Sequence, residues 1–126
     1  MALKFYVCNH CGNLAVMAKD SGVRPSCCGE AMQELVANTT DAAQEKHVPV
    51  IAKNGDAVEV CVGSAAHPMA DVHWIEFVAL ETSRGMQMCA LHPGEEPRAE
   101  FRLAPGEELL AAYAYCNLHG LWKAEA

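Results

Sequence analysis

The stretch Ala57-Val58-Glu59-Val60-Cys61-Val62 places valine at every second position. Because successive side chains of a β-strand point to opposite faces, this period of two predicts a strand with one buried face. Further strand-like segments follow along the chain: His73–Glu81, Gly85–Leu91, Ala99–Leu103 and Leu109–Cys116. Turn signals separate the segments, as Lys53-Asn54-Gly55-Asp56 does before the first. Short strands at this spacing, from about residue 48 onward, favour an all-β sandwich.

The segment that precedes these strands, residues 1–36, contains four cysteines and little else that could form a hydrophobic core. Below about 40 residues, a chain usually needs a metal or disulfides to fold by itself. We therefore expect a small cross-linked domain over residues 1–36 and the β domain over residues 37–126. Ala37-Asn38-Thr39-Thr40 reads as the linker, and Asp41-Ala42-Ala43-Gln44 has the spacing of a short capped helical turn.

The composition narrows the class of protein. A net charge of −7 argues against non-specific nucleic-acid binding, because phosphate contacts need clustered lysine and arginine. No apolar run approaches the roughly 18 residues of a membrane span, and the first residues do not resemble a signal peptide. We therefore expect a cytoplasmic protein with reduced thiols, in which a Cys-x-x-Cys spacing favours metal binding or redox chemistry over structural disulfides.

Cys8-x-x-Cys11 and the adjacent pair Cys27-Cys28 form the first candidate metal site. A Cys-x-x-Cys turn points two sulfurs at one metal, and a second pair completes a tetrahedral shell that suits zinc or iron. Because Cys27 and Cys28 are neighbours, we expect a distorted tetrahedron. By spacing alone, zinc fits at least as well as iron, and a structural zinc ribbon or a Cys27–Cys28 disulfide are alternatives. His10, inside the loop, is interpreted as a bystander.

The second candidate site combines four histidines with one cysteine: His47, His67, His73, Cys116 and His119. Most lie on predicted loops, and loops gathered at one end of a sandwich could bring them together. Five such ligands would leave one octahedral position open. A thiolate opposite that position would push electron density toward whatever binds there, as in thiolate-ligated haem. The set suits one-electron oxygen chemistry at iron. His92 is interpreted as a surface residue, and Cys61 and Cys89 as ordinary strand residues.

At these residues the chain resembles desulfoferrodoxin, the two-iron form of superoxide reductase, over essentially its whole length. Six segments in the same order carry the resemblance: Cys8-x-x-Cys11, Cys27-Cys28-Gly29-Glu30, Glu45-Lys46-His47-Val48-Pro49, His67-Pro68-Met69, His73-Trp74-Ile75-Glu76 and Cys116-Asn117-Leu118-His119-Gly120. The extra thiols Cys61 and Cys89 have no place in the family pattern.

The resemblance implies two mononuclear iron sites. A desulforedoxin-like domain over residues 1–36 would hold iron with Cys8, Cys11, Cys27 and Cys28. An immunoglobulin-like β-sandwich over residues 37–126 would hold the catalytic iron with His47, His67, His73 and His119 in a plane and Cys116 axial. Such proteins are typically homodimers that reduce superoxide to hydrogen peroxide with electrons from a rubredoxin-type donor.

Glu45 and Lys46 precede the predicted ligand His47 and are the candidate catalytic residues. Lys46 is the local positive group that could attract superoxide and hold water for proton delivery. The resemblance implies that Glu45 occupies the open position when the iron is ferric. The ordinary interpretation is a solvated charged pair. Rival functions are a non-catalytic rubredoxin-like electron carrier, a zinc-binding structural protein and a dismutase.

Overall fold

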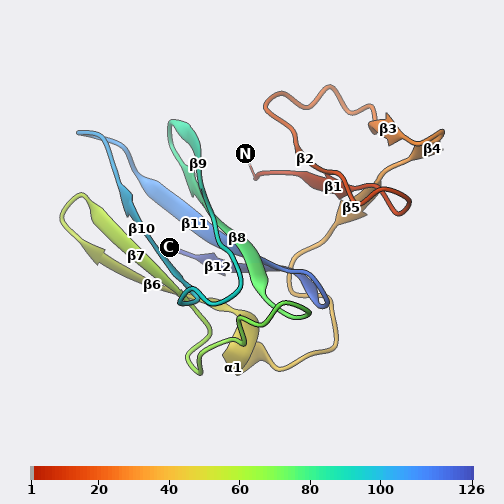
Figure 1. Ribbon diagram of the computed structural model, residues 1–126. Helices are drawn as coiled ribbons and strands as arrows, with labels where there is room; N and C mark the ends of the chain where they lie inside the picture. The colour runs from red at the N-terminus through yellow and green to blue at the C-terminus, as the bar shows by residue number, and fades with distance from the viewer. Residues whose placement is uncertain (1) are drawn as a thin grey trace. The chain divides into compact units, whose positions relative to one another are not determined.

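The computed structural model describes residues 2–126, which divide into two compact units between Val36 and Ala37. The smaller unit contains five short strands: β1 (Phe5–Val7), β2 (Leu14–Val16), β3 (Ser26–Cys27), β4 (Glu30–Ala31) and β5 (Gln33–Leu35). β1 pairs with β2 and β5 in one antiparallel sheet, and β3 pairs with β4 (Figure 1). Its own core cluster has three buried members, Tyr6, Cys8 and Met32. So small a core gives little stability without a cross-link.

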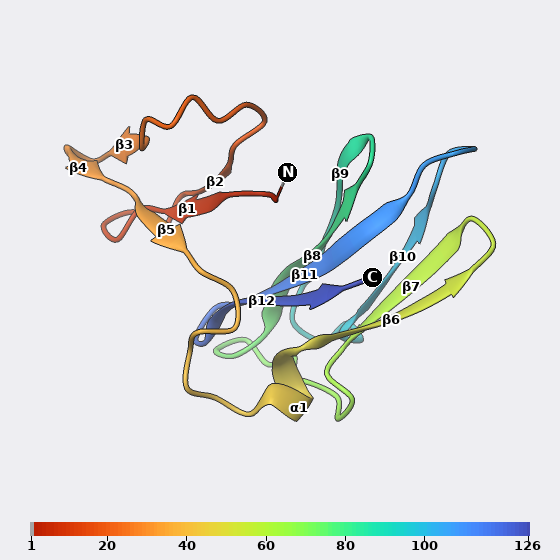
Figure 2. The same ribbon diagram turned by 180° about the vertical axis from the view of Figure 1, so that it is seen from behind.

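The larger unit is a sandwich of two antiparallel sheets (Figures 1 and 2). Its strands are β6 (Pro49–Asn54), β7 (Ala57–Val62), β8 (Ile75–Thr82), β9 (Gly85–Ala90), β10 (Arg98–Arg102), β11 (Leu109–Cys116) and β12 (Gly120–Glu125). One sheet has the order β10-β7-β6 and the other the order β12-β11-β8-β9. Three strands facing four in this way form an immunoglobulin-like sandwich. The predicted mainly β fold is therefore confirmed.

The core of the sandwich lies between the two sheets. On β7, Val58, Val60 and Val62 are all at most 1% exposed, whereas the residues between them are half-buried. Val78 and Leu80 of β8 meet them from the other sheet as members of the same buried cluster. The valine alternation in the sequence therefore marks the inward face of β7, as predicted.

Strand bounds follow the sequence prediction closely: β9 ends one residue earlier than predicted, and β10 begins and ends one residue earlier. β7 and β11 have the predicted bounds, whereas β8 begins at Ile75 because His73 forms an isolated bridge with Ala70 in the preceding loop. β12 was not predicted. Its sequence, Gly-Leu-Trp-Lys-Ala-Glu, buries the consecutive residues Leu121 and Trp122, so it lacks the period of two that identifies a half-buried strand.

The segment between the units differs from the prediction as well. The single helix of residues 2–126, α1 (Gln44–His47), has Ala43 as its N-cap, whose methyl group cannot accept a hydrogen bond. The predicted cap at Asp41 therefore lies two residues before the observed N-cap. Among the described residues, no helix is long and apolar enough to cross a membrane. In the predicted linker, the Asn38 amide bonds the backbone N–H and C=O of Lys123, at 2.9 and 3.0 Å.

Three segments lie at the same end of the sandwich: the helix α1, the loop from β7 to β8, and the turn from β11 to β12 (Figures 1 and 2). Gly63, at the start of the loop, has a φ of +84°. A Cβ at this position would lie 2.4 Å from the Ala65 carbonyl oxygen and 2.7 Å from that of Glu45. The loop and α1 therefore pack backbone against backbone, which only glycine permits.

Candidate metal centres

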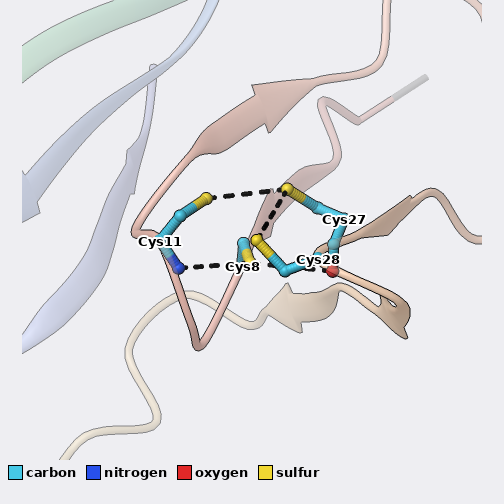
Figure 3. Close-up of side chains that lie close together, drawn as sticks. All are labelled: Cys8, Cys11, Cys27 and Cys28. Atoms are coloured by element: carbon cyan, nitrogen blue, oxygen red, sulfur yellow. Dashed lines mark hydrogen bonds between the residues drawn. The ribbon is translucent and has the colours of Figure 1, made fainter.

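Four cysteine sulfurs of the smaller unit lie within 4.8 Å of one another. Cys8 and Cys11 come from the segment after β1, and Cys27 and Cys28 from the end of β3 and the turn that follows (Figure 3). The Cys11 and Cys27 sulfurs are 3.6 Å apart, and those of Cys27 and Cys28 are 4.0 Å apart. A tetrahedral metal with bonds of about 2.3 Å separates its sulfurs by roughly 3.8 Å. The group therefore has the size of a tetrahedral zinc or iron site.

The adjacent cysteines converge through an unusual backbone conformation. Cys28 has a φ of +53°, and Gly29 follows with a φ of +73°. The left-handed region costs a residue other than glycine about 1–2 kcal/mol. This conformation turns the sulfurs of Cys27 and Cys28 toward the same centre (Figure 3). All seven cysteines, each within the described residues, are free thiols, so the alternative disulfide between Cys27 and Cys28 is not formed.

The ionisation of the four thiols also favours a bound cation. Backbone N–H groups of Cys11 and His10 lower the pKa of Cys8 to about 6. Hydrogen bonds with the thiols of Cys11, Cys8 and Cys27 raise the pKa of Cys28 to about 12. Thiols at such distances cannot all ionise side by side, and a bound metal removes the conflict. The His10 ring pairs instead with the Glu30 carboxylate at the surface.

Four histidines of the larger unit form a closed ring of imidazoles. His47 ends α1, His67 and His73 lie in the loop from β7 to β8, and His119 lies in the turn from β11 to β12. Ring centroids are separated by 4.7 Å for His47–His67, 4.7 Å for His67–His73, 5.2 Å for His73–His119 and 4.9 Å for His47–His119. Interplanar angles of 74° to 88° turn each ring nearly edge-on to the next. The predicted convergence of these loops is therefore present.

The nitrogen atoms inside the ring have the spacing of metal ligands. His47 Nε2 lies 3.2 Å from His67 Nε2 and 3.1 Å from His119 Nδ1. A metal bound at about 2.1 Å separates adjacent nitrogens of a square by roughly 3 Å. The outer Nδ1 atoms of His47 and His67 each lie 2.7 Å from a carbonyl oxygen, of Ala43 and Pro68 respectively. Since a carbonyl only accepts, both Nδ1 atoms carry the proton, and the Nε2 lone pairs face each other as if around a cation.

His73 Nε2 completes the inner set of nitrogens. Among residues 2–126, it is the one buried side-chain nitrogen or oxygen atom without a hydrogen-bond partner. Burial lowers the pKa of His67 to about 4, and burial, followed by the charges of His119 and His47, lowers the pKa of His73. Neutral imidazoles are the form that binds metals, so the ring fits a metal ion.

Cys116 adds a sulfur to the ring of nitrogens. Its side chain is fully buried, and its sulfur lies within 4.8 Å of the donor atoms of His47, His67 and His73 and 3.9 Å from His119 Nδ1. Burial raises the pKa of the thiol, while N–H groups of Leu118 and His119 act in the opposite direction. A bound cation would release the proton. Four nitrogens and one sulfur leave the sixth position of an octahedron for another ligand.

Glu45 and Lys46 lie on α1 directly before His47, and both side chains are exposed. Their backbone is held in place, because the Glu45 carbonyl accepts the Ala65 N–H at 2.8 Å. The positive charge of Lys46 contributes to the lowered pKa of His73. The lysine charge therefore acts on the ring of imidazoles although its side chain is in solvent.

The remaining thiols and histidine lie apart from both groups. Cys61 and Cys89 are half-buried residues of β7 and β9, as predicted for strand positions. Cys61 donates to the Glu59 carboxylate at 3.7 Å, and His92 is an exposed residue paired with Glu95. Among the described residues, the candidate metal-binding groups do not include these three side chains.

Trp122 contacts the ring and was not predicted from the sequence. Its indole stacks on the His47 imidazole, with centroids 4.8 Å apart, and its Nε1–H donates to the His119 carbonyl at 3.1 Å. It is 1% exposed. Its position three residues after His119 was the one hint of this contact in the sequence. The contact itself depends on strand β12, which was not predicted.

The fold and the two donor sets define a class: a protein with a four-cysteine metal unit joined to an immunoglobulin-like sandwich that carries a histidine–cysteine metal ring. The Desulfoferrodoxin family model matches residues 39–125. The desulfoferrodoxin of Clostridium acetobutylicum is 45% identical over 98% of this chain and 96% of its own length. The chain belongs to the desulfoferrodoxin family. Its four-cysteine and histidine–cysteine groups are consistent with the two iron sites of desulfoferrodoxin.

Solved structures resemble both units together or the larger one alone. The superoxide reductase of Treponema pallidum superposes with a TM-score of 0.84 at 37% identity, covering 99% of this chain and 100% of that one. A one-iron superoxide reductase of Giardia intestinalis superposes with a TM-score of 0.57 at 34% identity, covering 65% of this chain and 97% of that one. The agreement with the first therefore extends over both units.

Proposed function

We propose that this chain is a superoxide reductase, which converts superoxide into hydrogen peroxide with one electron and two protons. The observation that carries the proposal is the closed ring of four imidazoles with the buried Cys116 sulfur beside it. Family membership and the superoxide reductases among the similar structures support it. The rival electron-carrier function would leave this ring without a purpose.

In this proposal the catalytic iron would be held by the Cys116 sulfur and by the ring-facing nitrogens of His47, His67, His73 and His119. Bound Fe(II) supplies the electron that reduces superoxide. The chain contributes a nitrogen-rich, neutral donor set and one anionic sulfur, whose electron density favours release of the product as peroxide. The sixth position is where the substrate would bind.

Lys46 attracts the substrate in this mechanism. Superoxide is an anion, and the chain has a net charge of −7, so the protein as a whole repels it. The exposed Lys46 ammonium, whose positive charge contributes to the lowered pKa of His73, supplies a local attraction for an anion at the ring. The same ammonium would hold a water molecule that gives a proton to the reduced substrate.

Glu45 has a separate role in the oxidised protein. It precedes Lys46 on α1, two residues before His47, and its side chain is exposed. We assign it as the carboxylate that would bind the iron once the electron has been transferred. An anionic ligand there keeps other anions out and makes the oxidised site a poor oxidant of superoxide, which separates this function from dismutation.

Residues 1–36 form the tetrathiolate iron domain in this proposal, with Cys8, Cys11, Cys27 and Cys28 as ligands, and residues 37–126 form the catalytic domain. A rubredoxin-type protein donates the electrons in the cytoplasm, where the enzyme acts as a homodimer in detoxification. Val72 and Leu118, exposed residues beside His73 and His119, give such a donor an apolar contact next to the ligands.

Pulse radiolysis of the reduced protein tests the proposal. Superoxide should disappear in a second-order reaction with the protein, and one superoxide should be consumed for each histidine–cysteine iron that is oxidised. Absorption of the tetrathiolate iron should not change in that step. Superoxide decay at the rate of buffer alone would contradict the proposal and would favour the electron carrier.

A further inference from the structure

We propose that Asn117 is a positioning residue, which fixes the imidazole of His73 in the ring by binding the backbone on both sides of it. The inference rests on the proposed function, because it concerns the same iron site. Asn117 follows Cys116 and comes two residues before His119. One side chain would thus join the segment that carries the sulfur to the loop that carries His73.

Three hydrogen bonds link Asn117 to the two residues that flank His73. The Trp74 backbone N–H donates to Asn117 Oδ1 at 3.0 Å, and Asn117 Nδ2 donates to the Val72 carbonyl at 3.0 Å. The Asn117 backbone N–H donates to the Trp74 carbonyl at 3.2 Å. The side chain therefore spans His73 without contacting the metal site itself.

The side-chain orientation of Asn117 follows from its partners. A backbone N–H can only donate and a carbonyl can only accept, so Oδ1 must face Trp74 and Nδ2 must face Val72. This arrangement needs an acceptor and a donor on one short planar group. Aspartate has the same shape but would place a carboxylate oxygen against the Val72 carbonyl, where neither atom can donate.

The regular β-ladder between β8 and β11 ends beside this position, at the pair of Cys116 with Ile75. The pairing of β8 with β11 becomes irregular between Tyr115 and Cys116, where the register shifts. Two backbone bonds between Ala70 and His73, at 2.9 and 3.0 Å, close a small turn inside the loop. Because these bonds are internal to the loop, they do not determine where His73 lies relative to Cys116. The Asn117 side chain continues the cross-strand pairing beyond the end of the regular ladder.

His73 is oriented differently from His47 and His67. The outer nitrogens of His47 and His67 are anchored on the carbonyls of Ala43 and Pro68, which orients those rings directly. His73 instead meets its neighbours edge-on, with ring centroids 4.7 Å from His67 and 5.2 Å from His119. Asn117 holds the backbone that places this ring.

Asn117→Asp and Asn38→Asp are the matched pair of variants that tests this inference. Asn38 makes the same kind of double contact, to the N–H and C=O of Lys123, but on β12 and not beside a ligand. Each substitution adds one negative charge and keeps the size of the side chain. Each also places a carboxylate oxygen against one backbone carbonyl oxygen. Any difference between the two variants therefore reports on the location of the asparagine.

The readouts are the release of iron from the histidine–cysteine site to a chelator and the electron paramagnetic resonance spectrum of that site after oxidation. Asn117→Asp should release this iron about 10- to 100-fold faster, the usual range for groups behind metal ligands, and should change the spectrum. Asn38→Asp should match the wild type in both. Equal release rates and identical spectra for all three proteins would overturn the inference.

Hydrogen exchange of the iron-loaded wild type, read by mass spectrometry, keeps the inference testable should Asn117→Asp fail to fold. The Trp74 amide should exchange slowly, because it is bonded to Asn117 Oδ1, and rapid exchange would overturn the inference. The proposed function fails differently. A wild type that binds both irons and protects Trp74 but does not react with superoxide would contradict the function and leave the role of Asn117 intact.

Discussion

The two metal-binding groups are built in opposite ways. The four cysteines come from two tight turns of a unit whose own core cluster has three buried residues. The histidine–cysteine ring is assembled from α1, a loop and a turn at one end of a sandwich with an extensive core. The comparison teaches that the first unit depends on its metal for folding, whereas in the second the fold exists first and brings the ligands together.

Metal removal should reveal the largest difference between the two units. Stripping both metals with a chelator under reducing conditions should unfold residues 5–35 and leave the strands of the sandwich intact. The reason is that the core of Tyr6, Cys8 and Met32 is too small to stabilise the smaller unit alone. Hydrogen exchange by mass spectrometry resolves the two units. Retained protection of β1 and β5 in the metal-free protein would contradict the dependence on metal.

Cys116→Ser should have the next largest effect, on activity and not on folding. The hydroxyl is nearly the same size as the thiol but is a far weaker ligand, so superoxide reduction should fall more than about 100-fold, beyond the usual effect of groups behind the ligands. Stopped-flow kinetics of the reduced protein measures the loss. Cys61→Ser and Cys89→Ser are the controls, because both thiols lie on strands outside the ring. Retained activity in Cys116→Ser would refute the electronic role of the sulfur.

Gly63→Ala should displace α1, which carries His47, and thereby weaken iron binding by the ring of imidazoles. The new Cβ would collide with the carbonyls of Ala65 and Glu45, and the φ of +84° disfavours any side chain. Gly55→Ala is the matched control, since Gly55 also has a positive φ of +62° but nothing lies within 4 Å of a Cβ there. The control should lose about 1–2 kcal/mol of stability. Thermal melting and iron content should show a larger loss for Gly63→Ala, and equal losses would exclude the close packing as the cause.

Lys46→Ala should have the smallest effect, on the rate of substrate capture. At low ionic strength the second-order rate constant should fall about ten-fold, the lower end of electrostatic steering, and its dependence on salt should flatten. Lys53→Ala removes the same charge from exposed strand β6 and should change little. Pulse radiolysis over a range of salt concentrations measures both variants. Identical rates for Lys46→Ala and the wild type at low salt would rule out steering by this residue.

The sequence predicted the sandwich through patterns that its residues display locally. The valines of β7 alternate because one face is buried, and that pattern is readable without a structure. β12 escaped prediction because Leu121 and Trp122 are buried side by side, so its sequence does not alternate. The position of α1 was misjudged because the Asp41 spacing resembles a cap, whereas the helix begins after Ala43.

The metal-binding groups were predictable in membership but not in geometry. Cys8-x-x-Cys11 is local, whereas the ring of imidazoles depends on loops that meet only through tertiary packing. Which nitrogen of His47 faces the ring is decided by the Ala43 carbonyl, and the contacts of Trp122 and Asn117 depend on strands and loops far apart in sequence. Spacing in the sequence does not contain such information.

The yield of hydrogen peroxide per superoxide consumed tests the central claim most directly. Reduced protein is mixed with a known amount of superoxide, and the peroxide formed is measured while the histidine–cysteine iron is followed by absorption. A superoxide reductase gives one peroxide for each superoxide consumed, with oxidation of that iron. One peroxide for every two superoxides, with the iron returned to its starting state, would mean dismutation and would contradict the account.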